Sequence, residues 1–170
     1  MAKRLTLVIV FPLVGLGTYA QWPVGGPPAE KADHVLVLKQ ERRMFLQRDG
    51  RVLATYRISI GRNPEGAKTH AGDHRTPEGR YLLDWHNAQS KFHRSIHISY
   101  PNVQDIARSR QESVQPGGEI MIHGIQNGLG WLGRLHRWVD WTDGCIAVTD
   151  AEMDQIWQAV PDGTPIEIRP

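Results

Sequence analysis

The chain has 170 residues, of which 20 are Lys or Arg and 18 are Asp or Glu, and 40% of its residues are hydrophobic. This length supports one domain of ordinary size with its own core. The formal net charge of +2 excludes a strongly basic nucleic-acid binder, and the hydrophobic content excludes a disordered chain. The single cysteine excludes a disulfide framework within the chain and the zinc sites that need two or four cysteines.

The first 20 residues have the layout of a secretory signal peptide. Lys3 and Arg4 provide a positive start, an apolar run follows over residues 5–16, and Ala20 stands at a cleavage position. The apolar run is short for a membrane span, which needs about 20 residues. We therefore expect export to the periplasm or cell envelope. Residues 1–20 are then either cleaved or retained as an N-terminal anchor, and only an uncleaved segment would hold the chain at a membrane.

The next segment, residues 21–33, is rich in Pro and Gly and is predicted to be a spacer. Beyond it, β-strand signals dominate, and the Asp49-Gly50 pair between two apolar runs favours a type I′ hairpin. Thr149 and Glu152 form a capping box for a helix with apolar residues at helical spacing. The expected strands are residues 34–39, 43–47, 52–60, 80–85, 94–99, 120–123, 145–148 and 165–169; the expected helices are residues 102–110 and the segment after Thr149. This pattern predicts one mainly β, mostly antiparallel domain over residues 34–170 with a few short helices.

The lone Cys145 is the first candidate for chemistry. In an oxidising compartment thiols usually pair, so an unpaired one is either a buried core residue, an intermolecular partner or a reactive group. Cys145 follows Gly144, and a glycine there lets backbone N–H groups converge beside the sulfur, as an oxyanion hole requires. His123 ends another apolar run, and two strand ends can bring a thiol and its base together. A lone histidine would be structural, but the two together favour a Cys-His dyad.

Several motifs in order resemble the L,D-transpeptidase catalytic (YkuD) family, with the murein-transpeptidase-like YafK branch most similar. They are His123-Gly124 followed by Thr142-x-Gly144-Cys145, the Gly-rich block over residues 61–79, the segment His97–Asn102 and Pro116–Gly118. The similarity runs over about residues 34–170. It implies a mostly antiparallel, β-sandwich-like L,D-transpeptidase catalytic domain.

The resemblance also implies roles for individual residues. Cys145 would be the nucleophile and His123 the base, with the Gly124 carbonyl orienting the imidazole. The backbone N–H groups of Gly144 and Cys145 would hold the oxyanion. The family usually has His where this chain has Asp143, and a common Arg is replaced by Ala147. Candidates for substrate contact or for support of the site are Thr142, Asp143, His136, Tyr100 and Arg75.

The implied activity is acyl transfer on peptidoglycan peptides. Cys145 would form a thioester at the carbonyl of an L-configured centre, release a terminal D-amino acid and pass the acyl group to an amine. The resemblance also implies that carbapenems acylate the thiol, and that neither a cofactor nor a metal is needed. A wall-attached protein is a further candidate for the acyl acceptor. Two alternatives use the same chain differently: a hydrolytic L,D-carboxypeptidase, or an amidase that releases a wall-attached protein, and a catalytically silent wall-binding module. No nucleic acid is expected as a partner.

The glycine-rich stretch before the cysteine motif carries a second histidine. Gly128, Gly130 and Gly133 predict a flexible lid near the site, and His136 lies within it. His136 is nearer to Cys145 in sequence than His123 is, but it does not end an apolar strand. A catalytic base needs rigid support, so we expect His123 to be the base.

Overall fold

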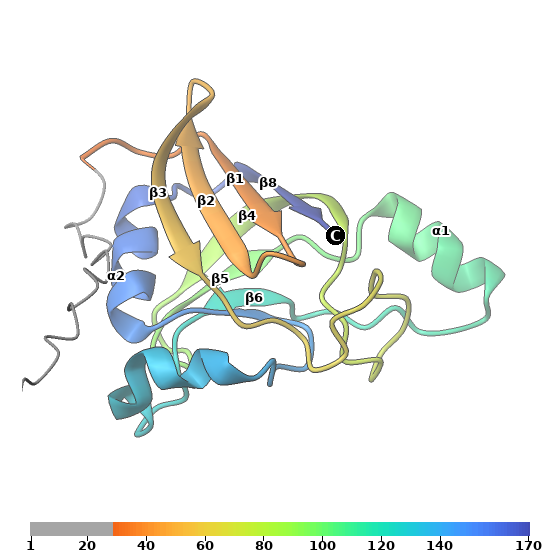
Figure 1. Cartoon of the computed structure of the whole chain (residues 1–170). Helices are drawn as coiled ribbons and strands as arrows, with labels where there is room; N and C mark the ends of the chain where they lie inside the picture. The colour runs from red at the N-terminus through yellow and green to blue at the C-terminus, as the bar shows by residue number, and fades with distance from the viewer. Residues whose placement is uncertain (1–28) are drawn as a thin grey trace, which may run out of the picture.

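The computed structural model describes residues 29–170, and these form one curled eight-stranded sheet with short helices beside it (Figure 1). The strands are β1 His34–Leu38, β2 Arg43–Arg48, β3 Arg51–Arg57, β4 Gly79–Asn87, β5 Ser95–Ile98, β6 Met121–His123, β7 Ile146–Ala147 and β8 Thr164–Arg169. The helices are α1 Val103–Gln111, the 3-10 segment η1 Gly130–Trp138 and α2 Asp150–Ala159.

Across the sheet the strand order is β3-β2-β1-β8-β4-β5-β6-β7. All neighbours are antiparallel except β1 with β8 and β6 with β7. The expected mainly β, mostly antiparallel domain with short helices is therefore confirmed. The predicted leader over residues 1–20 lies outside the described residues, as does most of the predicted spacer. In the part of the chain that is described, no helix is long and apolar enough to cross a membrane.

The hairpin between β2 and β3 forms as its turn residues predict. Asp49 has a φ of 48° and Gly50 a φ of 74°, and a type I′ turn needs positive φ at both central positions. Arg48 pairs with Arg51 directly across this turn. The local sequence signal thus sets the pairing next to the turn, and an irregularity between Leu46 and Gln47 shifts the register of the remaining pairs by one residue.

The core lies between the sheet and α2. Val35 and Val37 of β1 alternate with less buried neighbours, which is the pattern of a strand with one face in the core. Met153 and Ile156 of α2 are fully buried, and each such side chain stabilises the fold by about 1.5–3 kcal/mol. The predicted capping box is present, because Thr149 and Glu152 each accept the other's backbone N–H.

The glycine-rich stretch has more structure than the sequence suggested. Where we expected a flexible lid, η1 forms two short 3-10 helical turns joined by a kink at Gly133, whose φ is 46° and ψ is −126°. The glycine therefore provides a bend between helical turns. His136 of this segment is 7% exposed, whereas Trp131 and Trp138 are 75% and 83% exposed.

The parallel pair β6 and β7 forms one end of the sheet. His123 is in register with Ala147, and Ile122 with Ile146. Residues 58–62 run along the outer side of β7, where Ser59 bridges to Ala147. This end of the sheet is where the residues singled out from the sequence converge.

Candidate active site

Cys145 and His123 leave the same face of the sheet on neighbouring strands. The β6–β7 register places Cys145 level with Met121, one residue before β7 begins, and His123 two residues further along. Residues two apart in a strand share a face, so both side chains lie on one side of the sheet, diagonally opposed. The topology therefore makes the strand that ends at His123 a neighbour of the strand that follows Cys145.

The His123 ring is held in one tautomer. It is 4% exposed, and its Nδ1 donates to the carbonyl oxygen of Gly124 at 2.6 Å. Because a carbonyl can only accept, Nδ1 carries the proton and Nε2 of the neutral ring is an acceptor. Burial lowers the pKa of His123 to about 4, although the bond to Gly124 acts in the opposite direction.

Aromatic rings enclose the same imidazole. Phe92 lies 4.6 Å and Trp141 5.7 Å from His123, measured between ring centroids. These contacts leave the histidine little room to reorient. The ring is therefore rigid, neutral and able to accept a proton at Nε2.

The Cys145 thiol is also neutral in this structure. Its Sγ accepts the Met121 N–H at 3.4 Å and lies 3.6 Å from the Glu119 carbonyl oxygen, to which it donates. Burial raises the pKa of Cys145 to about 11, the Met121 N–H lowers it, and the charge of Asp143 raises it further. Among the described contacts none is a hydrogen bond between Sγ and His123. In the resting state the two candidate groups are thus a neutral thiol and a neutral imidazole.

The turn before the cysteine is closed by Thr142. Its hydroxyl donates to the Cys145 carbonyl at 2.7 Å and accepts the Gly144 N–H at 3.2 Å. Of the two N–H groups expected to hold an oxyanion, that of Gly144 is therefore engaged in this structure. Gly144 has a φ of 128°, and a Cβ built there would lie 2.6 Å from the Arg75 carbonyl oxygen. Only glycine fits this position.

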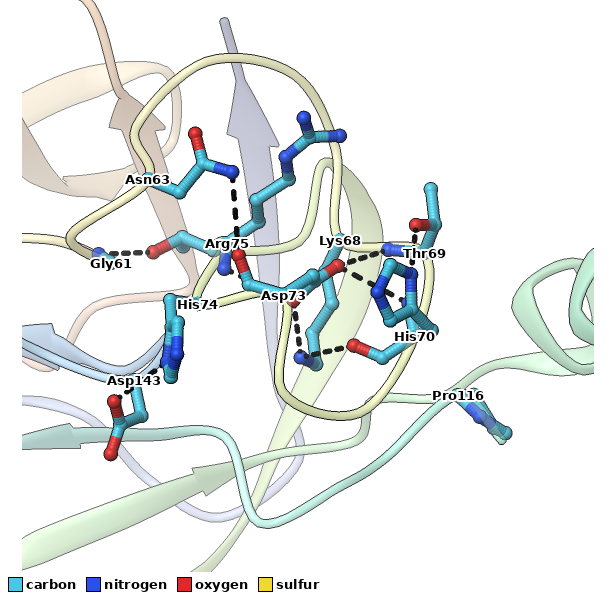
Figure 2. Close-up of polar contacts among 12 residues, drawn as sticks. Gly61, Asn63, Lys68, Thr69, His70, Asp73, His74, Arg75, Pro116 and Asp143 are labelled. Atoms are coloured by element: carbon cyan, nitrogen blue, oxygen red, sulfur yellow. Dashed lines mark hydrogen bonds and ion pairs between the residues drawn. The ribbon is translucent and has the colours of Figure 1, made fainter. Parts of the chain in front are cut away.

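The loop over residues 61–78 packs against this turn and is held by a buried ion pair. The Asp73 carboxylate accepts hydrogen bonds from Lys68 Nζ at 2.8 Å and from the backbone N–H groups of Thr69, His70 and Arg75 (Figure 2). Burial alone would raise the pKa of Asp73, but these donors hold it at about 2. The loop therefore carries its own polar core.

Asp143 projects from the cysteine turn toward this loop. Its Oδ1 lies 2.8 Å from His74 Nδ1 and also pairs with the Arg62 guanidinium (Figure 2 shows the histidine contact). Asp143 is 71% exposed. At the position where the resemblance led us to expect a histidine, the chain thus has a solvent-facing cluster of one carboxylate and two basic groups.

His136 lies behind the candidate base. Its Nδ1 accepts the Trp141 indole N–H at 3.3 Å, and Trp141 in turn contacts His123. Burial lowers the pKa of His136 to about 4, and the charge of Arg137 lowers it further. His136 therefore supports the aromatic wall around His123.

Two of the sequence candidates have other partners. Tyr100 is 3% exposed, and its hydroxyl donates to the Pro116 carbonyl at 3.1 Å. Arg75 contributes its backbone to the site, through its carbonyl against Gly144, while its side chain extends toward Gly66. The structure therefore assigns Tyr100 to the core and Arg75 to a backbone contact.

Sequence reasoning did not identify three participants. Phe92 contacts His123 from the irregular segment between β4 and β5, where no motif or periodicity distinguishes it. The Glu119 carbonyl meets the thiol from a residue with a φ of 56°. His74 belongs to the Gly-rich block that was singled out, but its partner became visible only in the folded chain.

The family comparison covers nearly all of the described domain. The model of the L,D-transpeptidase catalytic domain, YkuD, matches residues 32–168. YafK of Escherichia coli (strain K12), which is provisionally named an L,D-transpeptidase, is 26% identical over 148 residues, covering 84% of this chain and 50% of its own.

Solved structures agree with this match. The helical cell shape determining protein Pgp2 from Campylobacter jejuni is 26% identical with a TM-score of 0.62, over 83% of this chain and 48% of that one. Bd1075 from Bdellovibrio bacteriovorus has a TM-score of 0.55 at 24% identity, over 83% and 49%, and supports the fold. The chain spans about half the length of these relatives. Because the family model matches residues 32–168, the chain belongs to the L,D-transpeptidase catalytic domain (YkuD) family.

Proposed function

We propose that this chain is an exported cysteine acyltransferase of the L,D-transpeptidase type, acting on peptidoglycan stem peptides. The observation that carries the proposal is the placement of Cys145 and His123 on one face of two neighbouring strands, with His123 Nδ1 fixed by Gly124. Membership of the family supports the substrate class. The basic start and apolar run of residues 1–20 support export.

The reaction begins from two neutral groups. His123 Nε2 takes the thiol proton as Cys145 Sγ attacks the carbonyl carbon that follows an L-configured centre. The imidazolium then gives that proton to the amine of the departing D-amino acid, and a thioester remains. An acceptor amine then attacks the thioester carbonyl while His123 Nε2 takes a proton from it. The imidazolium gives this proton to the departing thiolate, which restores the Cys145 thiol. Water in place of the amine would give a carboxypeptidase or amidase.

The oxyanion formed in each step needs a donor beside the sulfur. We assign the Cys145 N–H as the first donor, because Thr142 Oγ1 occupies the Gly144 N–H. The Gly144 N–H can join only after this bond opens. Removing one such donor typically lowers a rate by 10²–10³-fold.

The experiment is incubation of the purified protein with defined muropeptides that carry a tetrapeptide stem, followed by mass spectrometry. A product that joins two stems, with loss of one D-amino acid, supports transfer. A shortened stem without joining identifies the hydrolytic enzyme. Cys145→Ala is the control, and muropeptides that remain unchanged with the wild-type protein would refute both activities and favour a silent wall-binding module.

A further inference from the structure

We propose that the outward side of η1 is a docking surface for an anionic phospholipid bilayer. This η1 surface consists of Trp131, Leu135, Trp138 and Val139, with Arg134 among them. The segment would lie at the depth of the lipid headgroups and would not span the membrane. This inference shares with the proposed function only the export of the chain, and it does not depend on the activity at Cys145.

The η1 surface gathers large apolar side chains that are exposed. Trp131 and Trp138 are 75% and 83% exposed, and Leu135 and Val139 are 51% and 66% exposed. Leu129, 41% exposed, adjoins them just before η1 begins. A soluble domain rarely leaves so many large apolar side chains exposed within one short segment, and such a patch marks an interaction site.

The opposite side of η1 is held against the domain. His136 is buried, its carbonyl accepts the Ser59 hydroxyl at 3.3 Å, and its Nδ1 accepts the Trp141 indole N–H. The Arg137 guanidinium pairs with Glu152 of α2. Figure 1 shows η1 as a light-blue helical ribbon below β6, at the edge of the molecule. The exposed residues are therefore presented outward by a segment whose other side is already fixed.

The charge of the η1 surface favours an anionic partner. Residues 126–139 include no Asp or Glu. Arg134 is exposed, and among residues 29–170 it has no hydrogen-bond or ion-pair partner. The next acid along the chain, Asp140, is already occupied by Arg42 at 2.7 Å and by the Ile60 N–H at 3.1 Å. An arginine beside exposed indoles matches a bilayer surface, where phosphates meet the cation and the amphipathic indoles lie at the interface.

A second copy of the chain suits this surface less well. If a tryptophan side chain has roughly 200 Å² of surface, the two indoles expose on the order of 300 Å², and Leu135 and Val139 add roughly half as much. A stable dimer buries about 800 Å² on each partner. A symmetric contact would also place Arg134 of both copies in an apolar interface to which residues 126–139 contribute no carboxylate. A lipid surface supplies phosphates and has no minimum area, since binding scales with the apolar area buried.

The predicted leader would keep the domain near lipid. Residues 21–28 separate it from the first described residue, and eight residues reach at most about 28 Å. An uncleaved leader would therefore hold the domain within that distance of a membrane, which raises the effective concentration of lipid at the η1 surface. The η1 surface is a second membrane contact, and it would remain after cleavage of the leader.

Docking at η1 would set the position of the candidate site relative to the membrane. Trp141 donates to His136 and lies 5.7 Å from His123, measured between ring centroids. One aromatic side chain thus connects η1 to the candidate base. The docked protein would act on substrate that lies next to the lipid surface.

The test measures how far brominated lipids quench the tryptophan emission of the full chain. Vesicles of phosphatidylcholine with about 30% phosphatidylglycerol are prepared with and without bromine on the acyl chains. We expect bromine to quench the wild-type emission. Trp131→Phe and Trp138→Phe should each lose part of the quenched emission, because phenylalanine keeps the apolar contact and removes the reporter. Trp85→Phe, which removes a 40% exposed indole from β4, is the matched control and should lose none, and Trp22 beside the leader contributes the same background to every variant.

A second set of variants weakens docking and keeps both reporters. Leu135→Asp places a carboxylate in the middle of the η1 surface and should weaken docking about tenfold or more, so the quenching of the two η1 indoles is lost. Val103→Asp, at an 82% exposed position of α1, is its matched control and should be quenched like the wild type. Arg134→Gln should reduce quenching by the vesicles with phosphatidylglycerol and leave quenching by pure phosphatidylcholine unchanged. Cys145→Ala should be quenched like the wild type, so a failure of the proposed activity leaves this test intact.

Three results would overturn the lipid surface. The first is equal quenching of the wild type, both η1 Trp→Phe variants and Leu135→Asp. The second is a wild-type dimer in sedimentation equilibrium that Leu135→Asp dissociates, without quenching by brominated lipid, which would assign the surface to a second copy. The third is an emission shift of the wild type with peptide-free glycan strands, again without quenching by lipid, which would assign the indoles to sugar rings.

Discussion

Replacing Gly144 with alanine tests the close contact between the cysteine turn and the loop over residues 61–78. The new Cβ would lie 2.6 Å from the Arg75 carbonyl oxygen and 3.2 Å from Ile120 Cδ1, at a φ of 128°. A non-glycine residue in such a backbone region costs about 1–3 kcal/mol, and overpacking adds about 1–3 kcal/mol. We expect a loss of about 3 kcal/mol in the free energy of unfolding.

Thermal unfolding followed by circular dichroism measures this loss. For a chain of this size, about 3 kcal/mol lowers Tm by roughly 6–12 °C. Gly118→Ala is the control, because a Cβ there meets nothing within 4 Å and its φ is not positive. It should leave Tm unchanged or slightly raised, since alanine restricts the unfolded chain. A Gly144→Ala protein that melts within 2 °C of wild type would refute the close approach of Arg75 to Gly144.

Four further predictions concern the candidate dyad. Intact mass should show a carbapenem adduct on the wild-type protein and none on Cys145→Ser. His123→Ala should slow adduct formation by about 10²–10⁴-fold, as expected for a lost general base, and His136→Ala should slow it far less; the reverse order would make His136 the base. Because burial raises the Cys145 pKa to about 11, iodoacetamide alkylation should keep accelerating above pH 9, and a plateau near pH 7 would contradict this. The pKa of His123 falls from 6.5 unfolded to about 4 folded, so stability is full above pH 6.5 and decreases by about 3 kcal/mol as the pH falls to 4. Urea unfolding at pH 7 and 5 should show about 2 kcal/mol of this decrease in wild type and a smaller one in His123→Gln.

Elements with strong local signals were predicted well from the sequence. The Asp49-Gly50 turn and the Thr149–Glu152 capping box depend on residues a few positions apart, and both are present. Asn102 was placed inside a helix, but its side chain caps α1 from just outside it. The segment η1 was not predicted, because its glycines indicated a flexible stretch. In the folded chain it forms helical turns, and its His136 is buried.

The same distinction between local sequence signals and long-range contacts applies to the candidate site. Cys145 and His123 could be identified because each adjoins an apolar run beside a glycine. The partners of Asp143 could not be predicted from the sequence. Arg62 and His74 contact it only when a loop about 70–80 residues earlier in the chain folds over the turn. The engagement of the Gly144 N–H by Thr142 depends on a turn geometry that no residue pattern specifies.

The loop over residues 61–78 has a polar core of its own, in addition to its bonds to the rest of the domain. Lys68 and Asp73 lie within it, so most of the bonds that shape residues 61–78 are internal. From outside the loop, the buried Lys39 ammonium donates hydrogen bonds to the carbonyl oxygens of Gly66 and Thr76 and to the carboxylate of Glu78. Exchanging the loop between members of the family, together with the residue at position 39, would therefore replace the basic groups that contact Asp143 and leave the strands next to the thiol and the imidazole unchanged.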